Sequence, residues 1–270
     1  MNSEHEVKDP TLHLPRILCL HGGGTNARIF RAQCRAIVGQ LKSEYRLVFA
    51  QGPFDSQAGP DVLSVYGKWG PFRRWLRWRP EDPMIRPEDA VNKVNQCLRE
   101  CMRQDDMLGA TGEWFALLGF SQGAKLAASL LYRQQVHDEL SGKHRGSTKF
   151  RFGILIAGRG PLVSLDSDLV LNPPLPDASQ ITDYRNSSGG MSTEKNSHVL
   201  RIPTLHVHGL EDEGIELHRH LFRDFCDEST RTLVEWDGNH RVPLKFKEVS
   251  WIVNQIRELD KATSLAEVTA

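Results

Sequence analysis

The chain lacks several features that mark whole classes of protein. It has no excess charge, because its 34 basic and 34 acidic side chains balance, whereas nucleic-acid binders usually carry a basic excess. No apolar run approaches the roughly 20 residues of a membrane-spanning helix. The polar start, MNSEHEVKDP, shows no secretory signal. We therefore expect a globular protein with no nucleic-acid or membrane partner.

A disulfide framework is also lacking. The cysteines are odd in number and scattered, at Cys19, Cys34, Cys97, Cys101 and Cys226. This usage indicates a reducing, cytoplasmic location. Cys97 and Cys101 share a face of a predicted helix, but without further spaced ligands they read as buried thiols rather than metal ligands. We expect neither a metal nor a cofactor.

Short apolar runs alternate with helical stretches along most of the chain. The predicted strands are 17–20, 47–50, 114–118, 152–156, 204–208 and 232–236. The predicted helices span 30–41, begin near 124, and span 245–258. Near-continuous apolar strands separated by helices predict an α/β fold with one mostly parallel sheet and helices on both faces.

The expected organisation is one domain at residues 15–260, preceded by a polar N-terminal arm at 1–14 and followed by a flexible tail at 261–270. Two segments, at 52–87 and 161–203, are too long for ordinary connections between a strand and a helix. Both follow the ends of strands, where open α/β sheets bind their ligands. We expect these insertions to form lids or substrate walls.

The strongest motif is Gly-Phe-Ser-Gln-Gly at 119–123, a G-x-S-x-G sequence between a predicted strand and a predicted helix. A sharp turn there exposes the serine hydroxyl, and the flanking glycines avoid collisions. The motif alone also occurs as an ordinary glycine-flanked turn, but its setting favours Ser121 as a nucleophile.

A serine nucleophile needs a base, and the base needs a carboxylate that orients it. His240 follows the last predicted strand and is the candidate base, the alternative being a solvated loop histidine. Asp212, just after the preceding strand, is the candidate acid. Glu211 and Glu213 are its neighbours and remain alternatives, and Asp237 is a weaker rival on the loop of the histidine.

The oxyanion of the reaction needs backbone N–H donors. One is expected from Gln122, directly after the serine, and the other from Gly23 or Gly24 in the glycine-rich turn at 21–25. The alternative for this turn is a phosphate-binding loop. It is disfavoured because neither G-x-x-x-x-G-K-[ST] nor G-x-G-x-x-G occurs there.

With these residues in place, the chain resembles the fungal serine hydrolases of the FSH family, a branch of the α/β-hydrolases. The resemblance covers nearly all of residues 15–258 and is carried by RILCLHG, GFSQG, HVHGLED and GNHRVP. It implies an α/β-hydrolase fold with Ser121 as nucleophile, Asp212 as acid and His240 as base. The opening HGGGTNARIF is similar to members encoded beside fungal polyketide synthases, of the citrinin, azaphilone and lovastatin types.

An unusual stretch at 72–79, FRRWLRWR, interleaves arginines with tryptophans. One interpretation is a lid whose aromatic side chains bind substrate, which makes Trp69, Trp75 and Trp78 candidate substrate contacts. The other is a basic surface that docks an acidic acyl carrier protein through Arg73, Arg74, Arg77 and Arg79. The two interpretations are compatible.

The function expected is hydrolysis of an acyl ester or thioester through an acyl-enzyme, with the resemblance implying a polyketide held on its synthase. One alternative is a free-standing carboxylesterase for small molecules. Another is a partner of the synthase without catalytic activity, which the complete set of Ser121, Asp212 and His240 disfavours. The acyl chain, the choice between hydrolysis and lactonisation, and the oligomeric state stay open.

Overall fold

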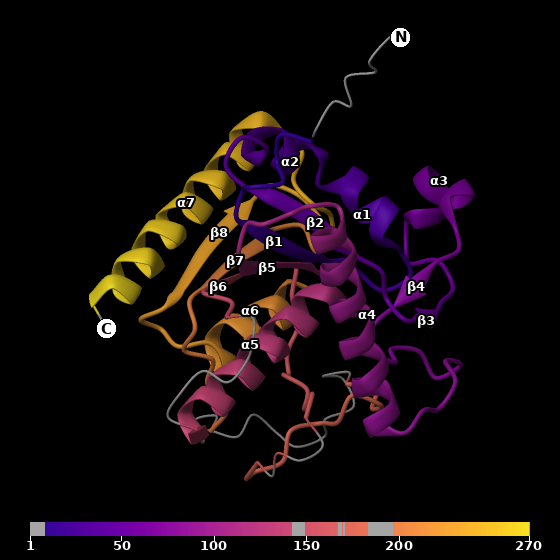
Figure 1. Ribbon diagram of the computed structural model, residues 1–270. Coiled ribbons are helices and arrows are strands. Elements are labelled where there is room, and N and C mark those ends of the chain that lie inside the picture. The colour runs from indigo at the N-terminus through magenta and orange to yellow at the C-terminus, as the bar shows by residue number, and fades with distance from the viewer. Residues whose placement is uncertain (1–8, 142–148, 167–168, 170, 183–196, 270) are drawn as a thin grey trace.

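A computed structural model of the chain describes residues 9–141, 149–166, 169, 171–182 and 197–269 (Figure 1). Its main sheet has six strands, all parallel, in the order β2-β1-β5-β6-β7-β8. The strands are β1 (Arg16–Leu20), β2 (Arg46–Ala50), β5 (Trp114–Phe120), β6 (Phe152–Ile156), β7 (Thr204–Gly209) and β8 (Arg231–Trp236). These are the six strands predicted from the apolar runs, so the parallel α/β architecture is confirmed.

Both faces of the sheet are covered by helices (Figure 1). On one face, Phe30, Ile37 and Val249 pack against the sheet. They come from α1 (Ala27–Gln33), α2 (Arg35–Leu41) and α7 (Phe246–Thr269). The other face is covered by α4 (Pro87–Met107), α5 (Gln122–Ser141) and α6 (Ile215–Phe225). Every residue of β1, β5, β6 and β7 is therefore buried, which explains why these strands are largely apolar.

The helices differ from the prediction at two places. The stretch expected as one helix at 30–41 is α1 followed by α2, and it begins earlier because the Asn26 side chain accepts the Ile29 N–H at 2.8 Å. The tail predicted at 261–270 is helical as far as Thr269 as part of α7, and its flexibility stays a prediction. There Ser264 Oγ accepts a hydrogen bond from Arg151 at 2.7 Å, which ties this last part to the body of the protein. No helix among the described residues is long and apolar enough to cross a membrane.

The first predicted insertion, 52–87, is a compact structure over the end of the sheet. It contains α3 (Val62–Tyr66) and two short antiparallel strands, β3 (Phe54–Asp55) and β4 (Arg73–Arg74). The described residues of the second, 161–203, form no helix or strand, yet Leu162, Val163 and Leu200 are buried against the core. Both insertions therefore belong to the packed domain. Residues 183–196 of the second insertion and 1–8 of the predicted arm lie outside the described residues.

The strand order changes direction at the centre of the sheet. From β1 the chain first adds β2 on one side and later adds β5 on the other. At such a switch point the connections after the two strands leave in opposite directions and open a crevice at their carboxyl ends. The turn after β1 holds Gly22 and Gly23, and the turn after β5 holds Ser121, so the fold brings the predicted oxyanion turn beside the predicted nucleophile.

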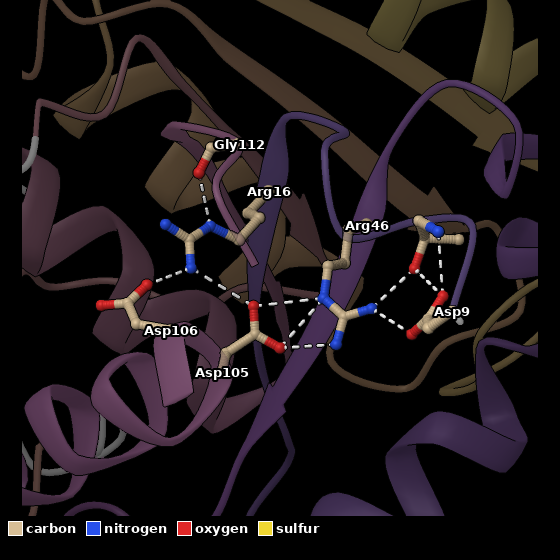
Figure 2. Close-up of polar contacts among 7 residues, drawn as sticks. Asp9, Arg16, Arg46, Asp105, Asp106 and Gly112 are labelled. Atoms are coloured by element: carbon tan, nitrogen blue, oxygen red, sulfur yellow. Dashed lines mark hydrogen bonds and ion pairs between the residues drawn. The ribbon is translucent and has the colours of Figure 1, made fainter. Parts of the chain in front are cut away.

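A network of ion pairs lies at the opposite side of the sheet, where the strands begin (Figure 2). Arg16 and Arg46 begin the neighbouring strands β1 and β2 and are paired in register. Asp105 of α4 lies between them, with its carboxylate 3.3 Å from Arg16 Nη1 and 2.7 Å from Arg46 Nη2. Arg46 also binds Asp9 at 2.6 Å, and Arg16 Nε donates to the Gly112 carbonyl at 2.6 Å. The network joins residue 9 of the predicted arm to both strands and to α4.

We expect Asp105→Ala to destabilise the fold without altering the chemistry at the other edge of the sheet. The substitution leaves two buried guanidinium groups without their shared carboxylate, and breaking such a buried pair costs about 3–5 kcal/mol. Chemical denaturation measures this loss. Asp106→Ala is the matched control, because that carboxylate is 54% exposed, and it should cost no more than about 1 kcal/mol. Equal losses in the two variants would contradict the central role of Asp105.

Candidate active site

Ser121 occupies a tight turn between β5 and α5. Its backbone has a φ of 53°, and its N–H donates to the Ile156 carbonyl at 2.9 Å. A Cβ at Gly119 would lie 2.3 Å from the Gly123 carbonyl oxygen, and one at Gly123 would lie 2.0 Å from that of Leu20. No side chain fits at either position, so the two glycines of the motif are required by the turn.

The structure brings the predicted base and acid to this serine. His240 Nε2 is 3.0 Å from Ser121 Oγ, and His240 Nδ1 is 2.7 Å from Asp212 Oδ2. The second carboxylate oxygen of Asp212 accepts the Gly214 N–H at 2.8 Å. The three side chains form one continuous chain of hydrogen bonds from three different loops. The rivals Glu211, Glu213 and Asp237 are all exposed, and Asp212 alone among these carboxylates reaches His240.

The loops that carry the acid and the base are bound to each other through their backbones. Leu210 N–H donates to the Trp236 carbonyl, and Glu211 N–H donates to the Gly238 carbonyl, both at 2.9 Å. A Cβ at Gly209 would lie 2.3 Å from the Gly238 oxygen. This close approach continues the pairing of β7 and β8 past their ends, so Asp212 and His240 are held as one unit.

The charge state of Asp212 is set by opposing effects. Burial alone would raise its pKa, but the hydrogen bond from His240 and the charges nearby lower the pKa to about 2. His218 of α6 lies behind the carboxylate, with Nε2 3.7 Å from Asp212 Oδ2, and is completely buried. Burial lowers the pKa of His218 to about 3, so this imidazole is neutral at neutral pH. Asp212 is therefore ionised beside a neutral ring.

His218 was not predicted to lie at the site. The sequence places it in a helix with His220 at a spacing that offers no shared face, and only the docking of α6 brings it to Asp212. The donor atoms of Asp212, His218 and His240 lie within 4.8 Å of one another, and these residue types bind zinc. A cation at that position would replace the proton that His240 Nδ1 shares with Asp212, so it would oppose the hydrogen-bond chain.

Two of the three predicted oxyanion donors, Gly23 and Gln122, lie at the cavity with Ser121, and the third, Gly24, is corrected. Gly23 and Gln122 both line the space in front of Ser121, and neither backbone N–H has a hydrogen-bond acceptor within the described chain. The Gly24 N–H instead donates to the Arg73 carbonyl at 2.9 Å. Gly24 has a φ of 71°, and a Cβ there would lie 2.2 Å from Gly59 N. It therefore joins the turn to the first insertion.

Ser121 and His240 open into a cavity of about 580 Å³. Its walls include residues of both insertions, among them Val62, Leu76, Trp78, Ile181 and Thr182. Polar side chains from several elements interrupt this largely apolar lining. Both insertions thus line the cavity beside Ser121, and their role as substrate walls stays a prediction.

Only one of the three predicted substrate-binding tryptophans lines this cavity. Trp78 does so. Trp75 is completely buried, and its Nε1–H donates to the His21 carbonyl at 2.9 Å, so its predicted contact with substrate is corrected to a structural role. Trp69 lies outside the lining, with the Arg28 guanidinium 4.2 Å from its ring centre.

The structure corrects one member, Arg74, of the predicted docking surface of Arg73, Arg74, Arg77 and Arg79. Arg74 is buried, and its Nε lies 3.2 Å from Asp82. Arg73 Nη1 pairs with Asp55 at 2.7 Å. The other two guanidinium groups donate to backbone carbonyls of the same insertion. The stretch therefore holds the insertion together, and its basic composition does not translate into one exposed basic surface.

Two side chains that sequence reasoning did not assign hold the insertion over the site. Gln122 Oε1 accepts the Trp75 N–H at 2.7 Å, and Gln122 Nε2 donates to the Leu76 carbonyl at 3.0 Å. His21 is buried, and its Nε2 accepts the Gly52 N–H at 2.9 Å. Burial lowers the pKa of His21 to about 4, which keeps Nε2 available as an acceptor. Their positions beside the motif glycines are the only signal in the sequence.

Comparison with known proteins identifies the class to which this geometry belongs. Residues 11–252 match the family described as Serine hydrolase (FSH1), and the chain belongs to this family. It is therefore a serine hydrolase, as its Ser-His-Asp arrangement indicates.

Individual relatives are similar over their whole length. The chain is 65% identical to esterase claE of Penicillium crustosum, covering 98% of this chain and 100% of that protein. It is 61% identical to esterase citA of Monascus ruber, covering 96% and 97%. Among solved structures, esterase PE8 superposes with a TM-score of 0.50 at 15% identity, covering 92% of this chain and 93% of that one. This last likeness concerns the fold alone and supports the α/β-hydrolase fold.

We expect Gln122→Ala to weaken substrate binding more than the chemical step. The variant keeps the backbone N–H at position 122 but loses the side-chain bonds to Trp75 and Leu76, each worth about 1 kcal/mol. Steady-state kinetics should show KM raised about tenfold, and hydrogen exchange should be faster at 75–78. Gln33→Ala is the control, because Gln33 lines the same cavity without such a bond. If hydrogen exchange at 75–78 were unchanged in Gln122→Ala, the Gln122 side chain would not be what holds this segment.

Proposed function

We propose that the chain hydrolyses acyl esters or thioesters through a covalent acyl-enzyme on Ser121. The observation that carries the proposal is the hydrogen-bonded chain from Ser121 Oγ through His240 to Asp212, at the mouth of a cavity of about 580 Å³. A serine hydroxyl becomes nucleophilic at neutral pH only when a base accepts its proton. The 3.0 Å contact with His240 Nε2 meets that requirement.

In the first half of the reaction, Ser121 Oγ attacks the acyl carbonyl carbon while its proton passes to His240 Nε2. The imidazolium that forms is stabilised by the ionised Asp212 at Nδ1, and it then protonates the departing alcohol or thiol. In the second half, a water gives its proton to the same nitrogen and attacks the acyl-enzyme. The acid product leaves, and the proton returns to Ser121 Oγ.

The negative oxygen of each tetrahedral intermediate is stabilised by the backbone N–H groups of Gln122 and Gly23. Both are free of protein acceptors within the described chain, and Gln122 is the first residue of α5, so the positive end of that helix adds to the effect. One such donor typically contributes about 10²–10³ in rate.

The preferred substrate is an acyl thioester, of the kind in which a polyketide is held on its synthase. The support is the resemblance of the 21–30 segment to members encoded beside polyketide synthases. A contact with an acyl carrier protein stays a prediction, reduced to Arg73, Arg77 and Arg79, because Arg74 is buried. The cytoplasmic location also stays a prediction.

A free-standing carboxylesterase is the second candidate. It is favoured by the names of the relatives, which are esterases, and by the use of the arginines at 73–79 for internal contacts. It would hydrolyse small oxyesters faster than thioesters with the same acyl group.

We expect Asp212→Asn to lower kcat by about 10⁴ with little change in KM. An amide at this position favours the wrong tautomer of His240 and does not stabilise its charged form. The rate of hydrolysis of 4-nitrophenyl butanoate measures the loss. Glu213→Gln changes an exposed carboxylate of the same loop and should retain wild-type activity. If Glu213→Gln lost activity and Asp212→Asn did not, Glu213 rather than Asp212 would be the catalytic acid.

The deciding experiment follows Ser121 by intact-protein mass. Wild type treated with a fluorophosphonate should gain a single phosphonyl group and turn over an acyl-N-acetylcysteamine thioester. Ser121→Ala should do neither, while Ser64→Ala, which changes an exposed serine of α3, should behave as wild type. No adduct on folded wild type would reject the proposal and favour a non-catalytic partner. Oxyester turnover without thioester turnover would favour the carboxylesterase.

A further inference from the structure

Arg159 is a second charged side chain at the catalytic cavity, and the reaction described above does not use it. It follows β6 in the segment Gly158-Arg159-Gly160, and its side chain shares the cavity lining with Ser121 and His240. A Cβ at Gly158 would lie 3.0 Å from Ala124 Cβ, and one at Gly160 would lie 3.0 Å from His220 Nδ1. The backbone on both sides is therefore packed tightly against α5 and α6, which fixes the point from which Arg159 enters the cavity.

The guanidinium of Arg159 has no protein partner in the part of the chain that the structure describes. It makes no ion pair and no hydrogen bond there, and its Nε is buried without an acceptor. Asp212 is the nearby carboxylate: a Cβ at Gly214 would lie 2.6 Å from Arg159 Nη2 and 3.2 Å from Asp212 Oδ1. Asp212 is already bound to Gly214 N–H and His240. Burying the Arg159 Nε–H without an acceptor costs free energy, which an anionic ligand in the cavity would offset.

The rest of the cavity lining carries the same sign of charge. Among the described residues, five cationic side chains, Arg159 included, line the cavity against one acidic side chain, Asp61: Arg35, Arg77, Lys125, Arg159 and Arg241. They come from separate elements around the opening. A concave site with walls of low dielectric constant focuses such a field and raises the local concentration of anions. The lining therefore favours a substrate with negative charge near the scissile bond.

We propose that Arg159 binds an anionic oxygen group of the substrate, and that the enzyme selects acyl esters or thioesters that carry one. Guanidinium groups bind carboxylate and phosphate oxygens through paired N–H donors, which suits this role. The anion has two possible sources: a carboxylate on the acyl chain, or the phosphodiester of a phosphopantetheine arm on the leaving side. The proposal rests on the proposed hydrolysis, and it assigns the substrate class of that same cavity.

The kinetic test compares matched substrates in wild type, Arg159→Gln and Arg159→Lys. On the acyl side, the glutaryl thioester of N-acetylcysteamine is compared with its terminal carboxamide analogue. On the leaving side, butanoyl-N-acetylcysteamine is compared with butanoyl-phosphopantetheine. Wild type should prefer one anionic member by about 10–100-fold in kcat/KM, the size of a charged hydrogen bond. The pair that shows the preference identifies the source of the anion.

Arg159→Gln should abolish that preference and leave the neutral substrates within about twofold, and Arg159→Lys should restore part of it. Arg86→Gln is the matched control, because Arg86 lies outside the cavity lining and pairs with Asp89 at 2.8 Å, and it should retain the preference. A wild type that hydrolyses both members of each pair equally would overturn the role of Arg159 and leave the proposed hydrolysis intact.

A binding measurement keeps the two proposals separate. Glutarate or phosphopantetheine should slow fluorophosphonate labelling of wild type and not of Arg159→Gln. Labelling that is fast and unaffected by either anion would reject the anion site while showing a reactive serine. Protection by an anion without turnover of any ester or thioester would retain the anion site and reject the proposed hydrolysis.

Discussion

The active site depends on one steric constraint, the turn in which β5 passes into α5 around Ser121. The backbone there is left-handed, with a φ of 53°, and this conformation is costly for a residue with a side chain. It is held because the Ser121 N–H is bound by the Ile156 carbonyl of β6, and because Gly119 and Gly123 let helix, strand and the end of β1 approach within van der Waals distance. The same close packing starts α5 at Gln122, so one turn presents the hydroxyl and an oxyanion donor together.

The remaining groups reach this turn from neighbouring strands, and two kinds of contact hold them. Asp212 and His240 are carried by loops whose backbones remain bonded beyond β7 and β8, which makes the acid and the base a rigid pair. The first insertion is held by side chains, chiefly Gln122 and His21, and by backbone hydrogen bonds that join Gly59 and Arg73 to the 21–25 turn. The turn that carries the Gly23 N–H is therefore bound directly to this wall of the cavity.

Patterns local in sequence predicted the strands and the positions of Ser121 and His240, because buried strands and nucleophile turns leave short-range signatures. Contacts between distant segments were not predictable in the same way. Trp75 and Arg74 lie in a stretch whose composition indicates an exposed lid, yet both are buried. Arg74 pairs in β4 with Phe54 of β3, and the Trp75 indole N–H donates to the His21 carbonyl. His218 lies behind Asp212 only because α6 packs on β7, and helical spacing alone gave no indication of it.

The zero net charge of the chain conceals an unequal distribution between the two edges of the sheet. At the edge where the strands begin, Arg16 and Arg46 share Asp105, so buried cations are matched by a buried anion and contribute to the fold. At the edge where the strands end, cations outnumber acids around the cavity and Arg159 has no partner among the described residues. A cation without a partner there lowers the stability of the unliganded protein, and binding of an anionic ligand would restore that stability. The distribution of charge, rather than its sum, therefore carries the information about substrate.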